Sequence, residues 1–457
     1  MSADMIAPPV NHAMKVLDRS FFQKTVPTSA ARIFNPKNIA TCRTELHRAQ
    51  DAWLNARIAP IRLDPDEERA RVGGKCILLR PEVLHNERSG TVGVIPYDLR
   101  LDYSYFNYLE IMNAIIPPSD QSGHDDLPTG FSMVGHVAHL NLRDKYLPYK
   151  HLIAAVLADK NPTVTTVINK LDNVGSESAY RTFQYEVLYG PDDMDVTVSE
   201  QHCTFSFNFA NVYWNSRLQG EHERLCDMFQ EGDAICDVMA GVGPFAIPAG
   251  KKKCFVWAND LNPDSYKYLL EGIQKNKVAD FVRPLNEDGH EFIRTATADL
   301  LKSEHSVPVF PKKKISRKDP NPPKGPREPL KTLVRPRLFS HYVMNLPASA
   351  IAFLPSFIGL YSTIPGISAN EIRRLFTPHT ETPLPMIHVY CFSTKSDDNI
   401  AEGHDICRRI SRELGHEVTP ATPELQIWDV RDVAPKKRMF CASFRLPEEV
   451  AFKGVED

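Results

Sequence analysis

The sequence predicts an α/β fold, with a Rossmann-like parallel sheet in the second half of the chain and smaller α+β domains before it. An apolar stretch that ends at Asp237 runs into a tight Gly-x-Gly turn at Gly241 and Gly243. The next apolar stretch is closed by an acidic residue, Asp260, about twenty positions later. From residue 213 onwards, strand-like and helix-like segments alternate, as they do in parallel sheets with helical connections.

The alternating segments can be placed along the C-terminal half. We expect strands near 233–239, 254–260, 281–286, 340–346 and 386–393, and helices at 216–230, 264–277, 348–360 and 398–414. Two further strand-like runs, 425–430 and 439–446, are separated by a short segment and predict an antiparallel hairpin. A parallel sheet finished by such a hairpin is typical of class I methyltransferases rather than of two-half dinucleotide folds.

Composition suggests how the chain is divided. We expect a flexible N-terminus at 1–30, an N-terminal domain at 31–117, a middle α+β domain at 128–212, and a C-terminal domain at 213–457 with an insertion at 302–337. Residues 311–337 contain ten Lys or Arg, two acids and seven prolines, a composition that cannot build a core. This segment is either a solvated insertion or a flexible arm attracted to phosphate.

Bulk composition excludes some classes of protein. No run approaches the eighteen apolar residues that indicate a membrane span, so we expect none. The nine cysteines lack a C-x-x-C pair, which suits a reducing compartment and predicts no metal site. Residues 15–37 are rich in Lys, Arg, Ser and Thr, so a mitochondrial presequence is compatible with the sequence.

The residues around the Gly-x-Gly turn indicate which cofactor binds. Asp237 precedes the glycines, where a carboxylate would repel a pyrophosphate but would suit the cationic end of S-adenosylmethionine. Asp260 would accept hydrogen bonds from ribose hydroxyls, and Asp288 follows the third strand, where an adenine amine would lie. The turn also satisfies a dinucleotide pattern, so a nicotinamide dehydrogenase is an alternative. The three aspartates could instead be helix caps and turn formers.

Two further motifs carry polar groups. Asn345–Pro347 resembles the Asn-Pro-Pro-aromatic tetrapeptide of nucleic-acid amino-methyltransferases, although Ala348 replaces the aromatic residue. Asn345 could alternatively cap a helix at 348. Ser216 and Gln219 have the spacing of a capping box, which predicts a helix start there. Arg217 and Glu221 would then share one helix face, either as a surface ion pair or at the edge of the cofactor pocket.

Taken in order along the chain, these and other motifs are similar to those of the archaeal–eukaryotic tRNA (guanine-N1)-methyltransferases that act at position 37. The matching segments are Pro128–Phe131, Gly135–Arg143, Leu147–Lys150, Arg181–Phe183, Val212–Leu218, Asp237–Pro248, Asn259–Pro263, Asn276–Val278 and Asn345–Pro347. The resemblance covers about residues 75–300 and 338–446. Gly272, where an Asn-rich pattern is usual, and the long insertion depart from the family pattern.

The resemblance implies an enzyme that transfers a methyl group from S-adenosylmethionine to N1 of guanosine 37 of tRNA, 3′ of the anticodon, and so supports reading-frame maintenance. It implies that Glu221 is the general base, that Arg217 and Asn345 hold the guanine, and that Arg181 and Tyr213 help to place the nucleotide. The cofactor site would comprise the motif residues Asp237, Gly241 and Gly243 together with His222, Asp260, Leu261, Asp288, Gly289 and Asn345.

These residue types suit the chemistry. Guanine N1 is protonated at neutral pH, and a partly buried carboxylate such as Glu221 can remove that proton. Negative charge then develops on O6, which a donor such as Arg217 can stabilise. We also expect tRNA recognition by residues 1–212, a monomer, and a location in the cytoplasm, nucleus and mitochondrial matrix. An aminocarboxypropyl transferase acting on a modified tRNA base and a non-catalytic RNA-binding relative are the alternatives.

Overall fold

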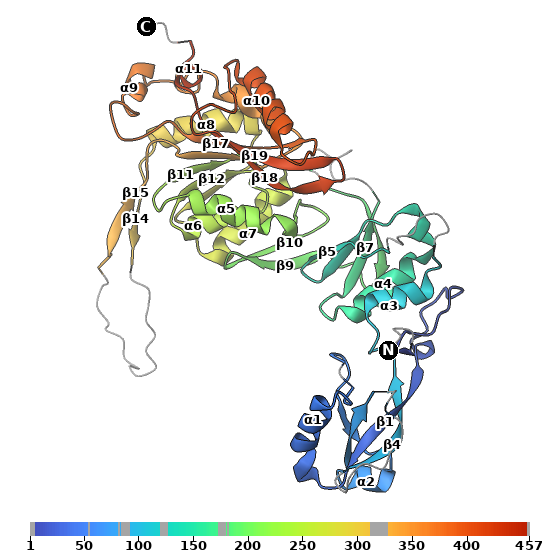
Figure 1. The fold of residues 1–457 in the computed structure, drawn as a ribbon. Helices are drawn as coiled ribbons and strands as arrows, with labels where there is room; N and C mark the ends of the chain where they lie inside the picture. Colours follow the sequence, from blue (N-terminus) through green and yellow to red (C-terminus); the bar gives the residue numbers. More distant parts are fainter. Residues whose placement is uncertain are drawn as a thin grey trace. The chain divides into compact units, whose positions relative to one another are not determined.

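The computed structural model describes most of the chain (Figure 1). The described residues are 5–53, 55–80, 83, 92–118, 127–171, 180, 182–310 and 328–454. By its internal contacts the chain divides into two compact units. The first holds residues 1–131, 139–169 and 186–191, and the second holds 132–138, 170–185 and 192–457. This division differs in detail from the boundaries expected from composition, because short segments of the middle region belong to the second unit.

The first unit begins with an antiparallel sheet. Its strand order is β2-β3-β1-β4, with β1 at Lys24–Ile33, β2 at Ile61–Leu63, β3 at Lys75–Leu79 and β4 at Val92–Leu101. The expectation of a flexible N-terminus up to residue 30 is wrong from Lys24 onwards, because β1 is an inner strand and buries Val26 and Ala30. The helical segments are η2 Arg19–Phe21, η3 Pro36–Asn38, α1 Ile39–Arg48, α2 Glu67–Arg71 and α3 Tyr108–Ile115.

Strands and one longer helix follow in residues 128–212. A four-stranded sheet has the order β5-β6-β7-β8, with bounds Phe131–Val134, Val137–Leu140, Thr166–Lys170 and Tyr185–Tyr189. The helical segments are η4 Asp144–Tyr149 and α4 Lys150–Lys160. β9 Asp195–Glu200 and β10 Cys203–Asn208 form an antiparallel pair in the second unit.

The second unit is built on a seven-stranded sheet of order β13-β12-β11-β16-β17-β19-β18. The first five strands are parallel: β13 Val282–Leu285, β12 Phe255–Asn259, β11 Ala234–Asp237, β16 His341–Met344 and β17 Met386–Ser393. β19 Lys437–Arg445 and β18 Gln426–Ala434 complete it as an antiparallel hairpin. The predicted Rossmann-like sheet with a terminal hairpin is confirmed.

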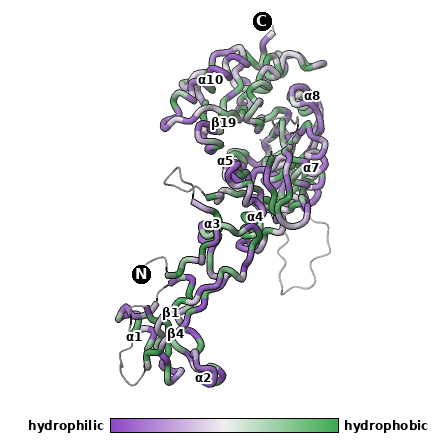
Figure 2. The backbone as a smooth tube through the Cα atoms, turned by 90° about the vertical axis from the view of Figure 1, so that its right-hand side faces the viewer, coloured by the Kyte–Doolittle hydropathy of each residue, from purple (hydrophilic) through white to green (hydrophobic). Residues whose placement is uncertain are grey.

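Helices cover both faces of this sheet (Figure 1). On one face α8 Gly289–Lys302, η6 Ala350–Phe357 and α10 Ile400–Leu414 share a single hydrophobic core with the strands. On the other face lie α5 Gln219–Met228, α6 Ala246–Lys251 and α7 Pro263–Asn276. In Figure 2 the helices α7, α8 and α10 alternate between hydrophilic and hydrophobic colour, as expected for helices with one face on a core.

Some helices differ from the sequence-based expectation. The segment 348–360, expected as a helix, contains a 3-10 helix, η6, with Pro355 inside it. Helices α6 and α8 were not expected. In α8, Phe292, Ala296 and Leu300 are buried at four-residue spacing, so a helical pattern was present. The helices expected at 264–277 and 398–414 are confirmed as α7 and α10.

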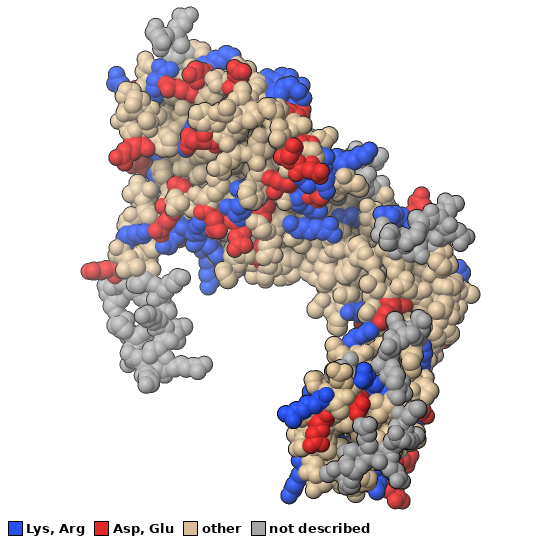
Figure 3. Space-filling model, viewed as in Figure 1, with Lys and Arg blue, Asp and Glu red and all other residues tan. Residues whose placement is uncertain are grey.

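The remaining elements lie outside the central sheet. β14 Ser306–Val309 and β15 Lys331–Val334 pair on either side of residues 311–327, the part of the predicted basic insertion that lies outside the described ranges. Two short helices are α9 Ala369–Arg373 and α11 Glu448–Ala451. Among the described residues, no helix is long and apolar enough to cross a membrane. On the face shown in Figure 3, acidic and basic side chains are interspersed over the second unit.

A side chain at the end of α7 ties this helix to β10. The Asn276 amide oxygen accepts the Thr204 N–H at 2.9 Å, and its amide nitrogen donates to the Thr204 carbonyl at 2.8 Å. Asn276 thus pairs with the free edge of β10 as a neighbouring strand would. Gly272 lies on the preceding turn of α7, and an added Cβ would lie 2.8 Å from Ile247 Cδ1, so the Ile247 side chain would have to shift. Close packing of α6 on α7 therefore explains this departure from the family pattern.

We expect Asn276→Ala to lower the free energy of unfolding by about 1–3 kcal/mol, because it leaves two backbone groups of Thr204 without partners. Urea unfolding followed by circular dichroism measures the change. Lys275→Ala is the control, because it removes only an exposed hydrogen bond to Ser206 and should change stability by less than about 0.5 kcal/mol. Equal effects of the two variants would contradict this role of Asn276.

Candidate active site

The carboxyl ends of β11, β12 and β16 meet at one edge of the sheet. Asp237 is in register with Ala258 on one side and with Val343 on the other. From β11 the chain first proceeds to β12 and β13, and then returns to β16 on the opposite side of β11. Such a reversal of strand order opens a crevice above the strand ends, where open α/β sheets bind ligands.

The Gly-x-Gly turn has the backbone conformation that requires glycine. Gly241 has a φ of 57° and Gly243 a φ of 95°. A Cβ on Gly243 would lie 2.7 Å from Leu269 Cδ1, whereas a Cβ on Gly241 would meet no atom within 4 Å. Gly243 therefore permits close packing against α7, and Gly241 leaves the backbone open to the crevice.

Asp260 holds this turn in place. Its carboxylate accepts the Gly241 N–H at 2.8 Å and the Asn262 N–H at 2.9 Å. Burial raises the pKa of Asp260, and these two backbone donors partly oppose that shift. The neighbouring Asn259 accepts the Glu287 N–H at 2.8 Å and donates to the Val238 carbonyl at 3.1 Å. Asn259 and Asp260 thus fix three loops at the edge of the sheet.

A cleft of about 710 Å³, open solvent at its mouth included, lies above these strand ends. Its lining combines apolar side chains with a few polar groups: Tyr180, Tyr213, Val238, Met239, Gly241, Asn259, Asp260, Leu261, Asn262, Ser265, Asp288, Gly289, Asn345, Leu346 and Phe353. Such a lining suits a ligand that carries an apolar ring system and several hydroxyl or amine groups.

The structure brings together about half of the residues singled out from the sequence. Those that line the cleft are Tyr213, Gly241, Asp260, Leu261, Asp288, Gly289 and Asn345. Those that do not line it are Arg217, Glu221, His222, Asp237 and Gly243. Arg181 lies outside the described residues. Their roles in binding and catalysis stay predictions.

Two of the lining residues also have local structural roles. Asp288 is the N-cap of α8 and accepts the His290 N–H at 2.9 Å. It is therefore a helix cap as well as a lining residue of the cleft. Asn345 does not cap a helix, since η6 begins later with Ser349 at its N-cap. The turn after Asn345 is held to β17 because the Phe392 N–H donates to the Pro347 carbonyl at 3.1 Å.

The sequence reasoning missed an aromatic wall of the cleft. Phe353 of η6 lines the cleft and stacks on His290, with ring centroids 4.0 Å apart. The Asn345 motif has Ala348 where an aromatic residue is usual, and Phe353 supplies a ring from five positions further along. No sequence signal indicates this, because the 3-10 geometry of η6 decides which side chain faces the cleft.

Asp237 is a buried carboxylate, and among the described residues neither of its oxygens has a hydrogen-bond partner. Burial, and then the nearby charge of Asp260, raise the pKa of Asp237 well above its usual value. An unpartnered carboxyl directly before the Gly-x-Gly turn is an unmet acceptor. It fits a cofactor that brings an amine or other donor, as S-adenosylmethionine would, and it does not fit a pyrophosphate.

The capping box expected at Ser216 and Gln219 is wrong. Asn215 is the N-cap, and its side chain accepts the Arg217 N–H at 3.2 Å to start a short 3-10 helix, η5 Ser216–Leu218, before α5. The Ser216 hydroxyl instead donates to the Met133 carbonyl at 2.8 Å. Arg217 therefore lies in η5 and not in α5, and its guanidinium makes no ion pair with Glu221 among the described contacts.

Glu221 is buried on α5 and bound by two other side chains. Arg224 donates to both of its oxygens at 2.7 Å, and the Tyr390 hydroxyl donates to Oε1 at 2.7 Å. Although burial lowers the pKa of Arg224, the hydrogen bonds and charge of Glu221 outweigh that effect and raise it. The guanidinium also lies 5.1 Å from the ring of Trp428. Oε2 accepts only one hydrogen bond and so keeps a lone pair.

His222, predicted at the cofactor site, points to a different partner. Its Nδ1 is 2.6 Å from Glu200 Oε1, and both side chains are buried. Its ring packs edge-on against Phe245 at 4.9 Å between centroids. Phe245 follows the Gly-x-Gly turn, so His222 supports the turn from behind.

Comparison with known proteins agrees with this geometry. The family described as the TRM5/TYW2 methyltransferase domain matches residues 196–307, and the TYW2 N-terminal domain family matches residues 109–193. A structure of Trm5b from Pyrococcus abyssi has a TM-score of 0.57 at 21% identity, and covers 92% of this chain and 99% of that one. A structure titled as the complex of aTrm5 and tRNALeu has a TM-score of 0.55 at 18% identity, with the same coverage. Fold and site together define a class I methyltransferase.

Sequence relatives identify the family more closely. A tRNA (guanine(37)-N(1))-methyltransferase of Phaeosphaeria nodorum is 62% identical over 99% of this chain and 100% of the relative. A protein of the same name from Aspergillus fumigatus is 48% identical over 99% of this chain and 96% of the relative. One from Schizosaccharomyces pombe is 42% identical over 96% of this chain and 95% of the relative. The chain belongs to the tRNA (guanine(37)-N(1))-methyltransferase family.

We expect Asp237→Asn to raise the melting temperature of the cofactor-free protein at pH 7 and to weaken cofactor binding, because it removes a buried, unpartnered charge. Since the pKa of Asp237 is raised, the wild-type carboxyl takes up a proton as the pH falls, and the difference in stability should disappear in acid. Differential scanning calorimetry and titration calorimetry measure the two effects. Asp280→Asn, at an exposed carboxyl, is the control; a loss of stability in Asp237→Asn would count against an unmet buried charge.

We expect Arg224→Met to destabilise the second unit by about 3–5 kcal/mol, because it leaves the buried Glu221 carboxylate without a counter-ion. The double variant Arg224→Met/Glu221→Leu should recover most of this loss. Urea unfolding of both variants provides the measurement. Arg217→Met is the control on the preceding turn and should have little effect, since Arg217 has no ion pair in the described structure. Failure of the double variant to recover stability would refute the pairing.

Proposed function

We propose that this protein transfers a methyl group to N1 of guanosine 37 of tRNA, next to the anticodon, and so supports maintenance of the reading frame. The observation that carries the proposal is the full-length identity of 62% to a relative named for this activity. The cleft at the switch point of the sheet, with Asp260, Asp288 and Asn345 in its lining, supports it.

The methyl donor is S-adenosylmethionine, whose sulfonium supplies an already activated methyl group. The cleft would hold it, with Asp260 and Asp288 offering acceptors to its hydroxyl and amine groups and Leu261 and Phe353 offering apolar walls. Asp237 offers a further acceptor before the Gly-x-Gly turn. The chain's own residues therefore have to orient the guanine and remove its N1 proton.

We assign proton removal to Glu221. Arg224 and Tyr390 fix its carboxylate, and the remaining lone pair on Oε2 can take the proton from N1. Burial excludes water from this carboxylate, which favours proton transfer over solvation. Arg217, at the start of the same helical segment, would stabilise the negative charge on O6. Asn345 and Tyr213, at the cleft, would contact the base.

Finer features of the proposal are the assembly state, partners and location. We infer that the protein acts as a monomer on tRNA, with Arg181 and the residues before 213 contributing to recognition. We place it in the cytoplasm, nucleus and mitochondrial matrix on the family resemblance. Sedimentation of the purified protein, and imaging of a C-terminally tagged chain, test the assembly state and the location.

We expect Glu221→Gln to lower the methyl-transfer rate by about 10²–10⁴-fold, because the amide cannot accept the N1 proton. Cofactor affinity should be unchanged, because the role assigned to Glu221 is towards the guanine and not towards the cofactor. Single-turnover transfer of radiolabel to tRNA transcripts with G or A at position 37 provides the measurement. Glu223→Gln, an exposed carboxyl on the same helix, is the control.

The product mass distinguishes the alternatives. A gain of one methylene-sized unit on guanosine 37 indicates methylation, whereas a far larger gain indicates transfer of the aminocarboxypropyl arm. If the protein binds RNA normally but transfers no group to any tRNA, it is a non-catalytic relative. A wild-type rate in Glu221→Gln would remove Glu221 as the base.

A further inference from the structure

β18, the outer strand of the seven-stranded sheet, contains a bulge next to an arginine. Asp429 pairs with Phe440 of β19 and Arg431 pairs with Met439, so that Val430 is an extra residue between them. Regular alternation would place Asp429 and Arg431 on the same face of the sheet. Because of the bulge they lie on opposite faces, which is how bulges re-aim a side chain.

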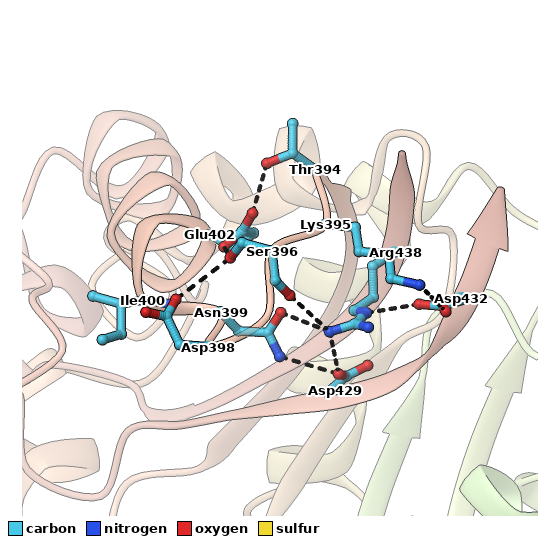
Figure 4. A network of polar contacts seen from close by, with 10 residues as sticks. All are labelled: Thr394, Lys395, Ser396, Asp398, Asn399, Ile400, Glu402, Asp429, Asp432 and Arg438. Carbon is cyan, nitrogen blue, oxygen red and sulfur yellow. Dashed lines mark hydrogen bonds and ion pairs between the residues drawn. The ribbon is translucent and has the colours of Figure 1, made fainter. Parts of the chain in front are cut away.

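On the face that carries Asp429, the two aspartates of β18 are paired with cations (Figure 4). Arg438 donates to Asp432 at 2.8 Å and to Asn399 at 2.8 Å, and it forms an ion pair with Asp429 at 2.9 Å. Lys395 pairs with Asp432 as well. This network holds β18 on both sides of Arg431 and so fixes the bulge that turns Arg431 to the other face.

The face that carries Arg431 is the one covered by α5. On this face Trp428 of β18 pairs with Cys441 of β19, and Cys441 pairs with Tyr390 of β17. The hydroxyl of Tyr390 donates to Glu221. The exposed ring of Trp428 contacts Arg224 of α5. The bulge thus directs Arg431 towards the side of the sheet where the predicted base lies.

Arg431 is also level with the active-site edge of the sheet. It pairs with Met439, and Met439 pairs with Phe392 at the end of β17. The Phe392 N–H donates to the carbonyl of Pro347, the last residue of the Asn345 motif. Arg431 is therefore level with the end of β17, and only β19 and β17 lie between it and the strand that leads into that motif.

Arg431 forms no ion pair with a carboxylate within the described part of the chain, although the nearby charge of Asp432 partly opposes the lowering of its pKa. Its Nε donates to the Asp432 carbonyl at 3.0 Å, and it forms no ion pair there; neither does Arg217. Burial, and then the positive charge of Arg217, lower the pKa of Arg431. Arg217 and Arg431 repel each other, and a bound anion would relieve the repulsion that Asp432 does not cancel.

We propose that Arg431 binds a backbone phosphate of the substrate RNA beside the target guanosine, next to Arg217. The proposal rests on the proposed function, because it is the tRNA substrate that brings the phosphate. A guanidinium suits this role because its planar fork can donate two hydrogen bonds to one phosphate. With Arg217 at the base and Arg431 at the phosphate, the target nucleotide would be held from both ends.

The first experiment measures binding of a tRNA transcript with G at position 37 to Arg431→Gln over a range of salt concentrations. We expect affinity to fall about tenfold, because a charge-assisted hydrogen bond is lost. The slope of log affinity against log salt concentration should become shallower by about the amount that one phosphate contact contributes. Arg431→Lys should keep the wild-type slope. Lys436→Gln removes one charge from the exposed turn of the same hairpin and should leave affinity within about twofold.

The second experiment tests whether the ligand is a phosphate. A tRNA with neutral methylphosphonates flanking nucleotide 37 should bind the wild-type protein more weakly, and Arg431→Gln should show no further loss. Full additivity of the substitution and the methylphosphonates, or wild-type affinity and slope in Arg431→Gln, would overturn the proposal. An unchanged melting temperature and cofactor affinity show that the variant is folded.

The outcomes separate this proposal from the proposed function. If the wild-type protein binds tRNA in an Arg431-dependent way but transfers no methyl group, the phosphate site stands and the function fails. If the wild-type protein methylates guanosine 37 and Arg431→Gln binds tRNA normally, the function stands and the phosphate site fails.

Discussion

The active site depends on the parallel register that brings the ends of β11, β12 and β16 to one edge of the sheet. Because these ends coincide, the carboxyl groups of Asp237 and Asp260 are buried close together, and each has a raised pKa. Asp260 recovers part of its desolvation cost by binding two backbone N–H groups, whereas Asp237 recovers none. The site is therefore held under electrostatic strain that a ligand with donor groups can relieve.

The hairpin that ends the sheet contributes more than extra strands. β17 supplies the hydroxyl that binds Glu221, and β18 supplies the ring that packs on Arg224. The predicted base is consequently fixed by segments far from α5 in sequence. This arrangement links the chemistry at Glu221 to the edge strand, where the bulge turns Arg431 to the same side.

Much of the C-terminal fold could be predicted from the sequence, because strand ends are marked by residues with strong local preferences. The glycines of the Gly-x-Gly turn require positive φ, and Asn262 and Pro263 start α7 by capping and by a fixed φ. The segment after Asn345 could not be predicted in the same way. Its apolar residues suit an α-helix, but Pro355 and the packing against the core produce a 3-10 helix that turns Phe353 to the cleft.

The sequence by itself determined the succession of the main-sheet strands along the chain, the turn at Gly241, and the carboxylates at the strand ends, because each depends on residues close together in the chain. Only the tertiary structure decided the partners of those groups. Glu221 could have paired with Arg217 at helical spacing, but the 3-10 start of the segment separated them, and Arg224 and Tyr390 bind it instead. Such pairings depend on register between distant strands and on burial, which local sequence does not specify.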